Sequence, residues 1–364
     1  MHAQFRIEKV DISTYEVPTD APESDGTFEW KSTTMILARI QGGGCRGIGY
    51  SYTDRSAAEL ARHVSARLVG RDLMDIEGAH CCLAIAVRNI GRAGVASTAI
   101  SALDTALWDL KARVLGVSLV ALLGGVRDRL PIYGSGGFTS YSDEQLAEQF
   151  RGWAEQGIRM MKMKVGREPD RDPHRVRRAC DVIGSGVQLF VDANGALSRK
   201  EALRLADIFA ESDVRWFEEP VSSDDLAGLR LLRDSGPAGM DISAGEYAYT
   251  LDDFRRLLEA GAVDVLQADA TRCAGITGFL KAAALCEAFH VPLSSHCAPA
   301  LHLHPGCAVG PMRHAEYFHD HVRIERMFFD GIPPVREGAL RPDRSSPGNG
   351  LIFKEADAAQ YRVN

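Results

Sequence analysis

Apolar and polar positions alternate along the chain in two ways, and the pattern changes near residue 125. Beyond that point, short apolar runs of strand length alternate with longer amphipathic stretches. This alternation is typical of βα units that build a parallel sheet. The apolar runs predict eight strands, at 130–134, 159–165, 188–192, 214–218, 240–244, 263–267, 291–295 and 313–316.

The stretches between these runs carry apolar residues at helical spacing. The first should begin after Ser142, whose hydroxyl can cap a helix, and end at Gly157. Eight strands joined by helices in this way predict a (β/α)₈-type barrel, a fold of about 250 residues. The seven helices are expected at 143–155, 172–182, 198–209, 226–234, 251–260, 276–289 and 300–309.

The residues before 125 predict a separate α+β domain rather than part of the barrel. Residues 18–26 are rich in Pro, Asp, Ser and Gly, and they predict a loop that can act as a mobile lid. The run 42–44 is Gly-Gly-Gly, but no helix follows it at once, so we expect a tight hairpin turn rather than a nucleotide-binding loop. Strands are expected at 4–16, 34–40 and 47–52, and helices at 57–68 and 97–114.

The division into domains follows from these elements. We expect the α+β domain at 1–125, the barrel at 126–325 and a tail at 326–364 that packs back on the first domain. The tail contains Pro333-Pro334 and the turn-rich segment 347–350, and no βα unit.

Ionisable residues stand at the ends of the predicted barrel strands, one for each strand from the second to the eighth. In such barrels the catalytic groups come from the carboxyl ends of several strands, so we expect these side chains to converge on the barrel mouth. Lys162 joins them, because it shares one face of its strand with Lys164. The residues are Lys164, Asp192, Glu218, Glu246, Asp269, His296 and Glu316.

Three of these residues are carboxylates on consecutive units: Asp192, Glu218 and Glu246. Buried together they would repel one another, and a hard divalent cation such as Mg²⁺ removes that cost. The alternative is three solvated loop acids. Asn194 and Glu219 lie beside them, either as supporting and substrate-binding groups or as plain loop residues.

The remaining groups suit proton transfer. A lysine near another cation loses its proton more easily, as a base must, although an exposed lysine at a strand end is the simpler interpretation of Lys162 and Lys164. Asp269 can fix the tautomer of His296 and leave its second nitrogen free to move a proton; otherwise His296 is a core residue. Arg272 can anchor either Asp269 or a substrate.

Two further histidines, His302 and His304, fall inside a predicted helix, and we expect them to be structural rather than zinc ligands. Taken together, a metal between two acid/base arms suits removal of a proton next to a carboxylate. The metal and Lys162 would stabilise the resulting enediolate.

Composition narrows the partners. The 364-residue chain has 45% hydrophobic residues and a net charge of −7, which argues against nucleic acid or a membrane surface as a partner. The eight cysteines form no C-x-x-C pair and predict free thiols in a reducing cytoplasm. No apolar run approaches the roughly 18 residues of a membrane span, and we expect a cytoplasmic protein.

These motifs resemble the enolase superfamily, and within it the mandelate racemase subgroup. The resemblance covers nearly the whole chain, through these segments: 106–111 (ALWDLK), 162–164 (KMK), 191–194 (VDAN), 217–220 (FEEP), 245–246 (GE), 267–269 (QAD), 294–296 (SSH) and Glu316. It implies a (β/α)₇β barrel with a capping domain whose 17–30 and 50–57 loops set specificity. Ala268 and the pair Ala274-Gly275 depart from the family pattern, which usually has proline and two glycines there.

The resemblance also implies roles for the strand-end residues. Asp192, Glu218 and Glu246 would bind Mg²⁺, Lys164 would be one base, and His296 paired with Asp269 the other. Lys162 would hold the substrate carboxylate, and Glu316 would hydrogen-bond the enediolate from the far side. Asn194 and Arg272 are the candidates for further substrate contacts.

The function that these roles predict is dehydration of a sugar acid to a 2-keto-3-deoxy acid by a homo-oligomeric enzyme. Two alternatives stay open. One is racemisation or epimerisation of an α-hydroxy acid by the same two arms, and the other is a non-catalytic protein that binds metal or ligand. The complete set of acid/base groups argues against the last.

Overall fold

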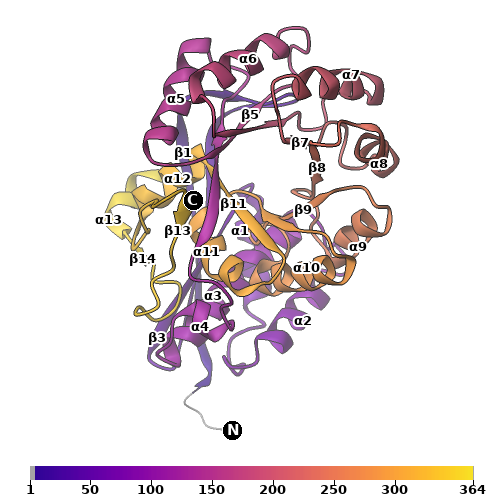
Figure 1. Cartoon of the computed structure of the whole chain (residues 1–364). Coiled ribbons are helices and arrows are strands. Elements are labelled where there is room, and N and C mark those ends of the chain that lie inside the picture. The colour runs from indigo at the N-terminus through magenta and orange to yellow at the C-terminus, as the bar shows by residue number, and fades with distance from the viewer. Residues whose placement is uncertain (1–4, 364) are drawn as a thin grey trace.

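The computed structural model describes residues 5–363, and its centre is a closed barrel of eight parallel strands (Figure 1). The strands follow one another around the barrel in chain order, and the last pairs with the first to close it. The predicted fold class is confirmed. The strands are β4 (Leu130–Gly136), β5 (Met160–Lys164), β6 (Gln188–Asp192), β7 (Trp216–Glu218), β8 (Asp241–Ala244), β9 (Val265–Ala268), β10 (Leu293–Ser295) and β11 (Met312–Phe318).

Seven helices join these strands and lie around the outside of the barrel (Figure 1). Ser142, Ser198 and Thr250 each accept a hydrogen bond from a backbone N–H of the first turn and form capping boxes, so local sequence sets these three starts. The helices are α5 (Asp143–Glu155), α6 (Asp172–Ile183), α7 (Arg199–Ala210), α8 (Leu226–Ser235), α9 (Leu251–Glu259), α10 (Gly275–Phe289) and α11 (Pro299–Ala308).

The capping domain is an antiparallel sheet covered by helices. Its long hairpin, β1 (Ile7–Ser24) and β2 (Glu29–Gly42), continues into β3 (Cys45–Tyr52) through a turn at Gly43 and Gly44. Both glycines have positive φ, so this is the tight turn expected there. Helices α1 (Ser56–Ser65) and α3 (Val95–Val114) match the predicted ones, whereas α2 (Ile76–Ala86) was not predicted, because its many Ala, Cys and Gly residues hide the helical period.

The expected loop at 18–26 was wrong for most of its length. Strand β1 runs to Ser24 and pairs with β2, with a register shift between Pro18 and Glu23 that accommodates the proline. The chain turns only after Ser24, where Asp25 Oδ1 accepts hydrogen bonds from the backbone N–H groups of Thr27 (2.6 Å) and Phe28 (2.7 Å). The hairpin tip is therefore a short turn on a long β-arm.

The end of the chain lies against both parts. Helix α12 (His319–Phe328), which was not predicted, follows β11 directly. Short strands complete the tail: β12 (Phe329–Asp330) pairs with β14 (Ile352–Phe353), β13 (Ala339–Leu340) with β4, and β15 (Arg362–Val363) with β1. The domain boundaries at 125 and 325 stay a prediction.

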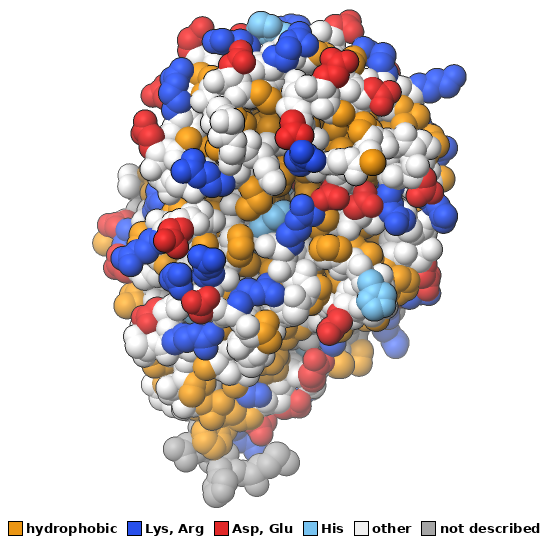
Figure 2. Space-filling model, in the orientation of Figure 1, with side chains coloured by type: hydrophobic (Ala, Val, Ile, Leu, Met, Phe, Trp, Pro, Cys, Tyr) orange, Lys and Arg blue, Asp and Glu red, His pale blue; other side chains and the backbone are white. Residues whose placement is uncertain are grey.

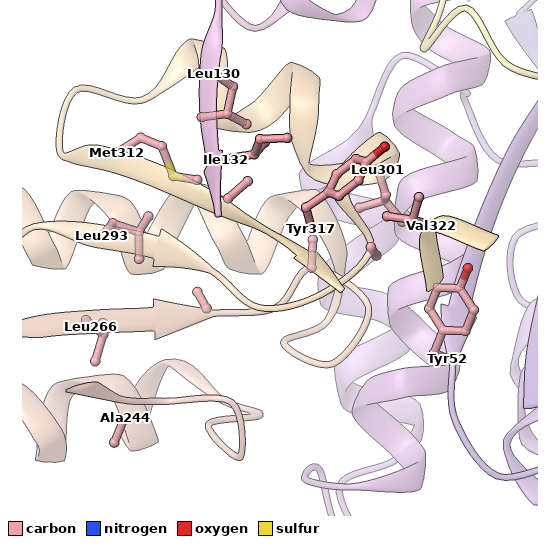
Figure 3. Packing of buried hydrophobic residues seen from close by; sticks show 14 of the residues in the cluster. Tyr52, Leu130, Ile132, Ala244, Leu266, Leu293, Leu301, Met312, Tyr317 and Val322 are labelled. Atoms are coloured by element: carbon pink, nitrogen blue, oxygen red, sulfur yellow. The ribbon is translucent and has the colours of Figure 1, made fainter. Parts of the chain in front are cut away.

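One hydrophobic cluster joins the barrel wall to the capping domain. Figure 3 shows Leu266 of β9 and Leu293 of β10 on neighbouring strands, with Val322 of α12 and Tyr52 of β3 at one end of the same cluster. Burial of so much apolar surface, at about 25 cal/mol per Å², fixes the capping sheet against one end of the barrel.

The surface carries mixed charge. Figure 2 shows acidic and basic side chains interspersed on the visible face, without a large area of one sign. Among residues 5–363, no helix combines the length and apolar character needed to cross a membrane.

Candidate active site

Alternation along the strands sorts the barrel interior into two layers. Tyr133, Phe190, Trp216 and Val265 point inward from four strands and fill the lower layer as a buried cluster. Two residues further along the same strands, the next inward positions are polar. This upper layer contains Lys162, Lys164, Asp192, Glu218, Gln267, Asp269, His296 and Glu316, and each of these side chains is buried.

Asp192, Glu218 and Glu246 meet in this upper layer. Each offers a carboxylate oxygen, and the three oxygens lie within 4.8 Å of one another. Glu246 Oε2 is buried without a hydrogen-bond partner. Trp216 Nε1 and Gln267 Nε2 each donate to Glu218 Oε2 at 2.9 Å and fix its orientation. Three convergent carboxylates, one of them with an oxygen that accepts no hydrogen bond, suit a hard divalent cation that takes oxygen ligands.

The two lysines neutralise this acidic cluster on one side. Lys162 Nζ lies 2.5 Å from Glu218 Oε1 and 3.2 Å from Asp192 Oδ2, and Lys164 Nζ lies 2.5 Å from Asp192 Oδ2. Burial acts to lower the pKa of Lys164, but the carboxylates of Asp192, Glu246 and Glu218 together outweigh burial, and the net pKa is raised. Both lysines are therefore ammonium ions whenever Asp192 stays against them.

The histidine arm borders the cluster on another side. His296 Nδ1 lies 2.8 Å from Asp269 Oδ2, and His296 Nε2 lies 3.3 Å from Glu246 Oε2. Burial acts to raise the pKa of Asp269, but the hydrogen bond and charge of His296, together with His302 and Arg272, outweigh burial, and the pKa lies below its ordinary range. An ionised Asp269 holds the proton on Nδ1 and leaves Nε2 facing the acids.

Glu316 is held between the two arms. Its Oε1 accepts hydrogen bonds from Ser135 Oγ (2.6 Å) and Lys162 Nζ (2.8 Å), and its Oε2 accepts one from the Cys297 backbone N–H (2.8 Å). Burial acts to raise the pKa of Glu316, but Lys162 and His296 lower it well below the ordinary value. Glu316 is therefore a fixed negative charge beneath His296.

A cavity of about 400 Å³ opens above these groups. Its floor includes Lys164, Asn194, Glu246, Arg272 and His296, so both candidate substrate-binding residues border it. Lys162 is 0% exposed and does not line the cavity, so its contact with a substrate carboxylate stays a prediction. The roof comes from the β1–β2 hairpin and the end of β3, through Asp25, Thr27, Phe28, Trp30, Ser32, Thr33, Thr34, Tyr52 and Thr53.

Arg272 and Asn194 occupy different positions at this floor. Arg272 Nη1 donates to the Glu246 carbonyl at 3.1 Å and lies 3.4 Å from its carboxylate, while Arg272 Nε lies 3.7 Å from Asp269. Asn194 Oδ1 is buried without a partner. Arg272 thus links the acidic cluster to the histidine arm, and Asn194 has an acceptor available.

The backbone turns sharply where the strands deliver these groups. Four residues lie within two positions of Asp192, Glu218 or His296 and have positive φ, between 36° and 51°: Asn194, Glu219, Cys297 and Ala298. Non-glycine residues in this region are strained by about 1–3 kcal/mol, and such strain concentrates at functional sites.

The two other histidines have structural contacts. His302 Nε2 accepts from the Ala270 backbone N–H at 2.8 Å, and His304 Nδ1 accepts from the Val120 N–H at 3.1 Å. Sequence reasoning missed Ser135, Gln267 and Cys297 at the mouth. Ser135 and Gln267 could have been found from the alternation along their strands, which places both side chains on the inward face. No pattern in the sequence singles out Cys297.

The fold and the residues at the barrel mouth together define the class of protein. It is a capped (β/α)₈ barrel with an acidic cluster at the carboxyl ends of its strands. Residues 145–357 match the family model for enolase C-terminal domain-like proteins, and residues 10–124 match that for the mandelate racemase / muconate lactonizing enzyme N-terminal domain. The chain therefore belongs to the enolase superfamily, in the mandelate racemase subgroup, and is an enzyme.

Similar proteins span nearly its whole length. A 3,6-anhydro-alpha-L-galactonate cycloisomerase of Streptomyces coelicolor is 34% identical over 95% of this chain and 97% of its own. The crystal structure of a mandelate racemase/muconate lactonizing enzyme-like protein from Rubrobacter xylanophilus is 50% identical, covering 98% and 100%, with a TM-score of 0.96. That of L-talarate/galactarate dehydratase from Salmonella typhimurium LT2, liganded with Mg and L-lyxarohydroxamate, is 29% identical, covering 99% and 93%, with a TM-score of 0.92.

Proposed function

We propose that the protein is a Mg²⁺-dependent dehydratase that converts a sugar acid to a 2-keto-3-deoxy acid. The observation that carries the proposal is the pairing of each arm with a different acid of one cluster. Lys164 lies against Asp192, and His296 lies against Glu246. A substrate carboxylate and its α-carbon seated at this cluster would have a proton-transfer group on each side.

Asp192, Glu218 and Glu246 would hold the cation through carboxylate oxygens. Mg²⁺ would supply positive charge that competes with the lysines for the Asp192 carboxylate and would stabilise the negative charge of an enediolate. The L-talarate/galactarate dehydratase structure named above contains Mg with a sugar-acid analogue, which supports this choice of cation and ligand class.

The residues of the chain would move two protons. Lys164 as the free amine, or His296 with Nε2 unprotonated, removes the α-proton. The other arm, or His296 after gaining that proton, protonates the β-hydroxyl, which leaves as water with the C–O bonding pair. The enol that remains becomes the 2-keto acid when its β-carbon gains a proton and its hydroxyl oxygen releases one to solvent.

The surrounding groups would orient the substrate. Lys162 lies against Glu316, where its charge can offset that of the enediolate. Polar residues of the capping domain line the cavity and suit a hydroxylated substrate: Thr27, Ser32, Thr33, Thr34 and Thr53. Arg272 and Asn194 would contact its polar groups from the floor.

Turnover tests the proposal directly. We would incubate the protein with Mg²⁺ and a library of mono- and diacid sugars and assay for 2-keto acid. Keto acid formation is the expected result. Exchange of the α-proton in deuterated water without keto acid would instead identify a racemase or epimerase. The absence of both keto acid and exchange would contradict an enzyme acting on these acids.

The same assay tests the two arms. Lys164→Ala and His296→Asn should each lower turnover by about 10²–10⁴-fold, the usual contribution of a positioned acid or base. Matched controls are Lys281→Ala and His290→Asn, which change the same residue types on the outer helix α10 and its C-terminus. Equal activity of an arm variant and its control would remove that residue from the mechanism.

Metal binding tests the acidic cluster independently of turnover. Mg²⁺ at 100 times its Kd should stabilise the folded parent by about 2.7 kcal/mol, measured as a rise in melting temperature. Glu246→Gln should reduce that rise, because it replaces an anionic oxygen ligand with an amide. The exposed acid Glu259, changed to Gln, is the control. A parent protein with no response to Mg²⁺ would contradict the metal site.

A further inference from the structure

A second group of possible metal ligands lies at the mouth, and none of its residues belongs to the acidic cluster. His296, Cys297 and Glu316 each offer one ligand atom within 4.8 Å of the other two, and all three residues are buried. Cys297 Sγ lies 3.3 Å from His296 Nε2, and Glu316 Oε2 lies 3.8 Å from the same nitrogen. One imidazole, one thiol and one carboxylate therefore converge on a single point.

The backbone is bent to bring the thiol to this position. Cys297 has φ 51° and Ala298 has φ 41°, two consecutive non-glycine residues in the left-handed region. The turn directs Cys297 toward the same cavity that His296 lines. An extended continuation of β10 would place successive side chains on opposite faces, so the thiol would leave the imidazole.

Ligand chemistry distinguishes this group from the three acids. Zn²⁺ binds Cys sulfur at about 2.3 Å and His nitrogen or carboxylate oxygen at about 2.0–2.2 Å, in a tetrahedron whose ligand atoms are about 3.3–3.6 Å apart. The two separations from His296 Nε2, 3.3 Å to Cys297 Sγ and 3.8 Å to Glu316 Oε2, lie near these values, and the third is at most 4.8 Å. Mg²⁺ prefers oxygen ligands and does not select a thiol.

We propose that His296, Cys297 and Glu316 form an inhibitory site for Zn²⁺, with the fourth ligand position open to the cavity. Zn²⁺ there would occupy His296 Nε2, the nitrogen that faces the acids, and would block proton transfer while Mg²⁺ stays bound. Binding stands on the geometry alone, and only the inhibition rests on the proposed function.

Co²⁺ is the probe for binding, because a cobalt–thiolate bond gives a charge-transfer absorption that oxygen and nitrogen ligands lack. We would titrate the protein with Co²⁺ in the presence of excess Mg²⁺ and record the near-ultraviolet difference spectrum. We expect a band that saturates at one Co²⁺ per chain and disappears when Zn²⁺ is added. A parent protein without this band would overturn the proposal.

Cysteine variants assign the band to its source. Cys297→Ser should abolish it, whereas Cys81→Ser, which alters the exposed thiol of the His80-Cys81-Cys82 segment, should keep it. Cys297→Ala is a second variant in case the serine hydroxyl destabilises the buried position, and thermal unfolding shows that each variant is folded. A band that persists in both folded Cys297 variants would overturn the assignment.

Inhibition has its own readout. At constant Mg²⁺, added Zn²⁺ should lower the turnover of the parent and of Cys81→Ser relative to their zinc-free rates, and Cys297→Ser should resist. If Zn²⁺ binds but lowers the turnover of the parent and of Cys297→Ser equally, the inhibitory role is overturned, whereas the binding site is not. Absence of all turnover would count against the proposed function, whereas the cobalt spectrum would still decide the metal site.

Discussion

Single residues at the mouth are charged and buried at once, which is stable only when each charge has a partner. Lys162 contacts three acids, Asp192, Glu218 and Glu316, at 3.2 Å or less. The sequence predicted that these residues would meet, because each ends or follows an apolar run. It did not predict that Lys162 would be withdrawn beneath the cavity, since that depends on the side chains around it.

One buried acid outside this network should make stability depend on pH. Burial raises the pKa of Glu325, on α12, to about 8 from its ordinary value of 4.5, and Tyr50 Oη and the Ala300 N–H bond to it at 2.6 Å and 3.2 Å. Between these two pH values the folded state keeps a proton that the unfolded state has released. The contribution of Glu325 to the free energy of unfolding is therefore fully present below pH 4.5 and is lost as pH rises through about 8.

Glu325→Gln should remove this dependence, because the amide can replace both hydrogen bonds and does not titrate. We expect the melting temperature of the variant, relative to the parent, to rise steadily between pH 5 and pH 8. Differential scanning fluorimetry at several pH values measures it. A constant difference across that range would show that Glu325 does not titrate in the folded protein.

At the scale of elements, the strand ends decide the chemistry through strained turns. Helix α10 begins beyond Ala274, which has φ 63° and ψ 35°, and Gly275 follows with φ 90°. The sequence shows alanine where relatives usually have a first glycine, and the structure shows that this alanine adopts the conformation that glycine takes without strain. Alanine in place of glycine at position 274 therefore leaves the backbone conformation of the turn before α10 unchanged.

Ala274→Gly should therefore stabilise the protein by about 1 kcal/mol, since a non-glycine residue in the left-handed region costs about 1–2 kcal/mol. Ala284→Gly, an exposed position inside the same helix, should destabilise it by about 1 kcal/mol. Urea denaturation of both variants measures these changes. The same sign for the two substitutions would show that strain at Ala274 is not relieved by glycine.

For the whole molecule, Asp109 of α3 joins segments far apart in the chain. Its carboxylate accepts hydrogen bonds from the Ile48 N–H (2.8 Å), the Asn349 N–H (2.7 Å) and Arg113 Nε (2.7 Å). These contacts connect β3, the capping helix and the C-terminal tail at one buried point.

Asp109→Ala should leave two buried backbone donors without partners, each at a cost of about 1–3 kcal/mol. We expect the free energy of unfolding to fall by at least about 2 kcal/mol, measured by chemical denaturation. Asp181→Ala, at an exposed position on α6, should change it by less than about 0.5 kcal/mol. A comparable effect of the two substitutions would mean that Asp109 does not link the tail to the capping domain.

The sequence by itself determined the barrel and the acids, lysines and histidine at its mouth. Strand parity and helix caps are local, so β6 and α5 begin and end where the pattern placed them. Tertiary structure decided the rest. Helix α12 escaped prediction because Asp320, His321 and Glu325 are buried polar residues that break its apolar period. The extension of β1 through 18–24 and the approach of Cys297 to His296 came from cross-strand pairing and a left-handed turn, and both depend on neighbours that no local pattern encodes.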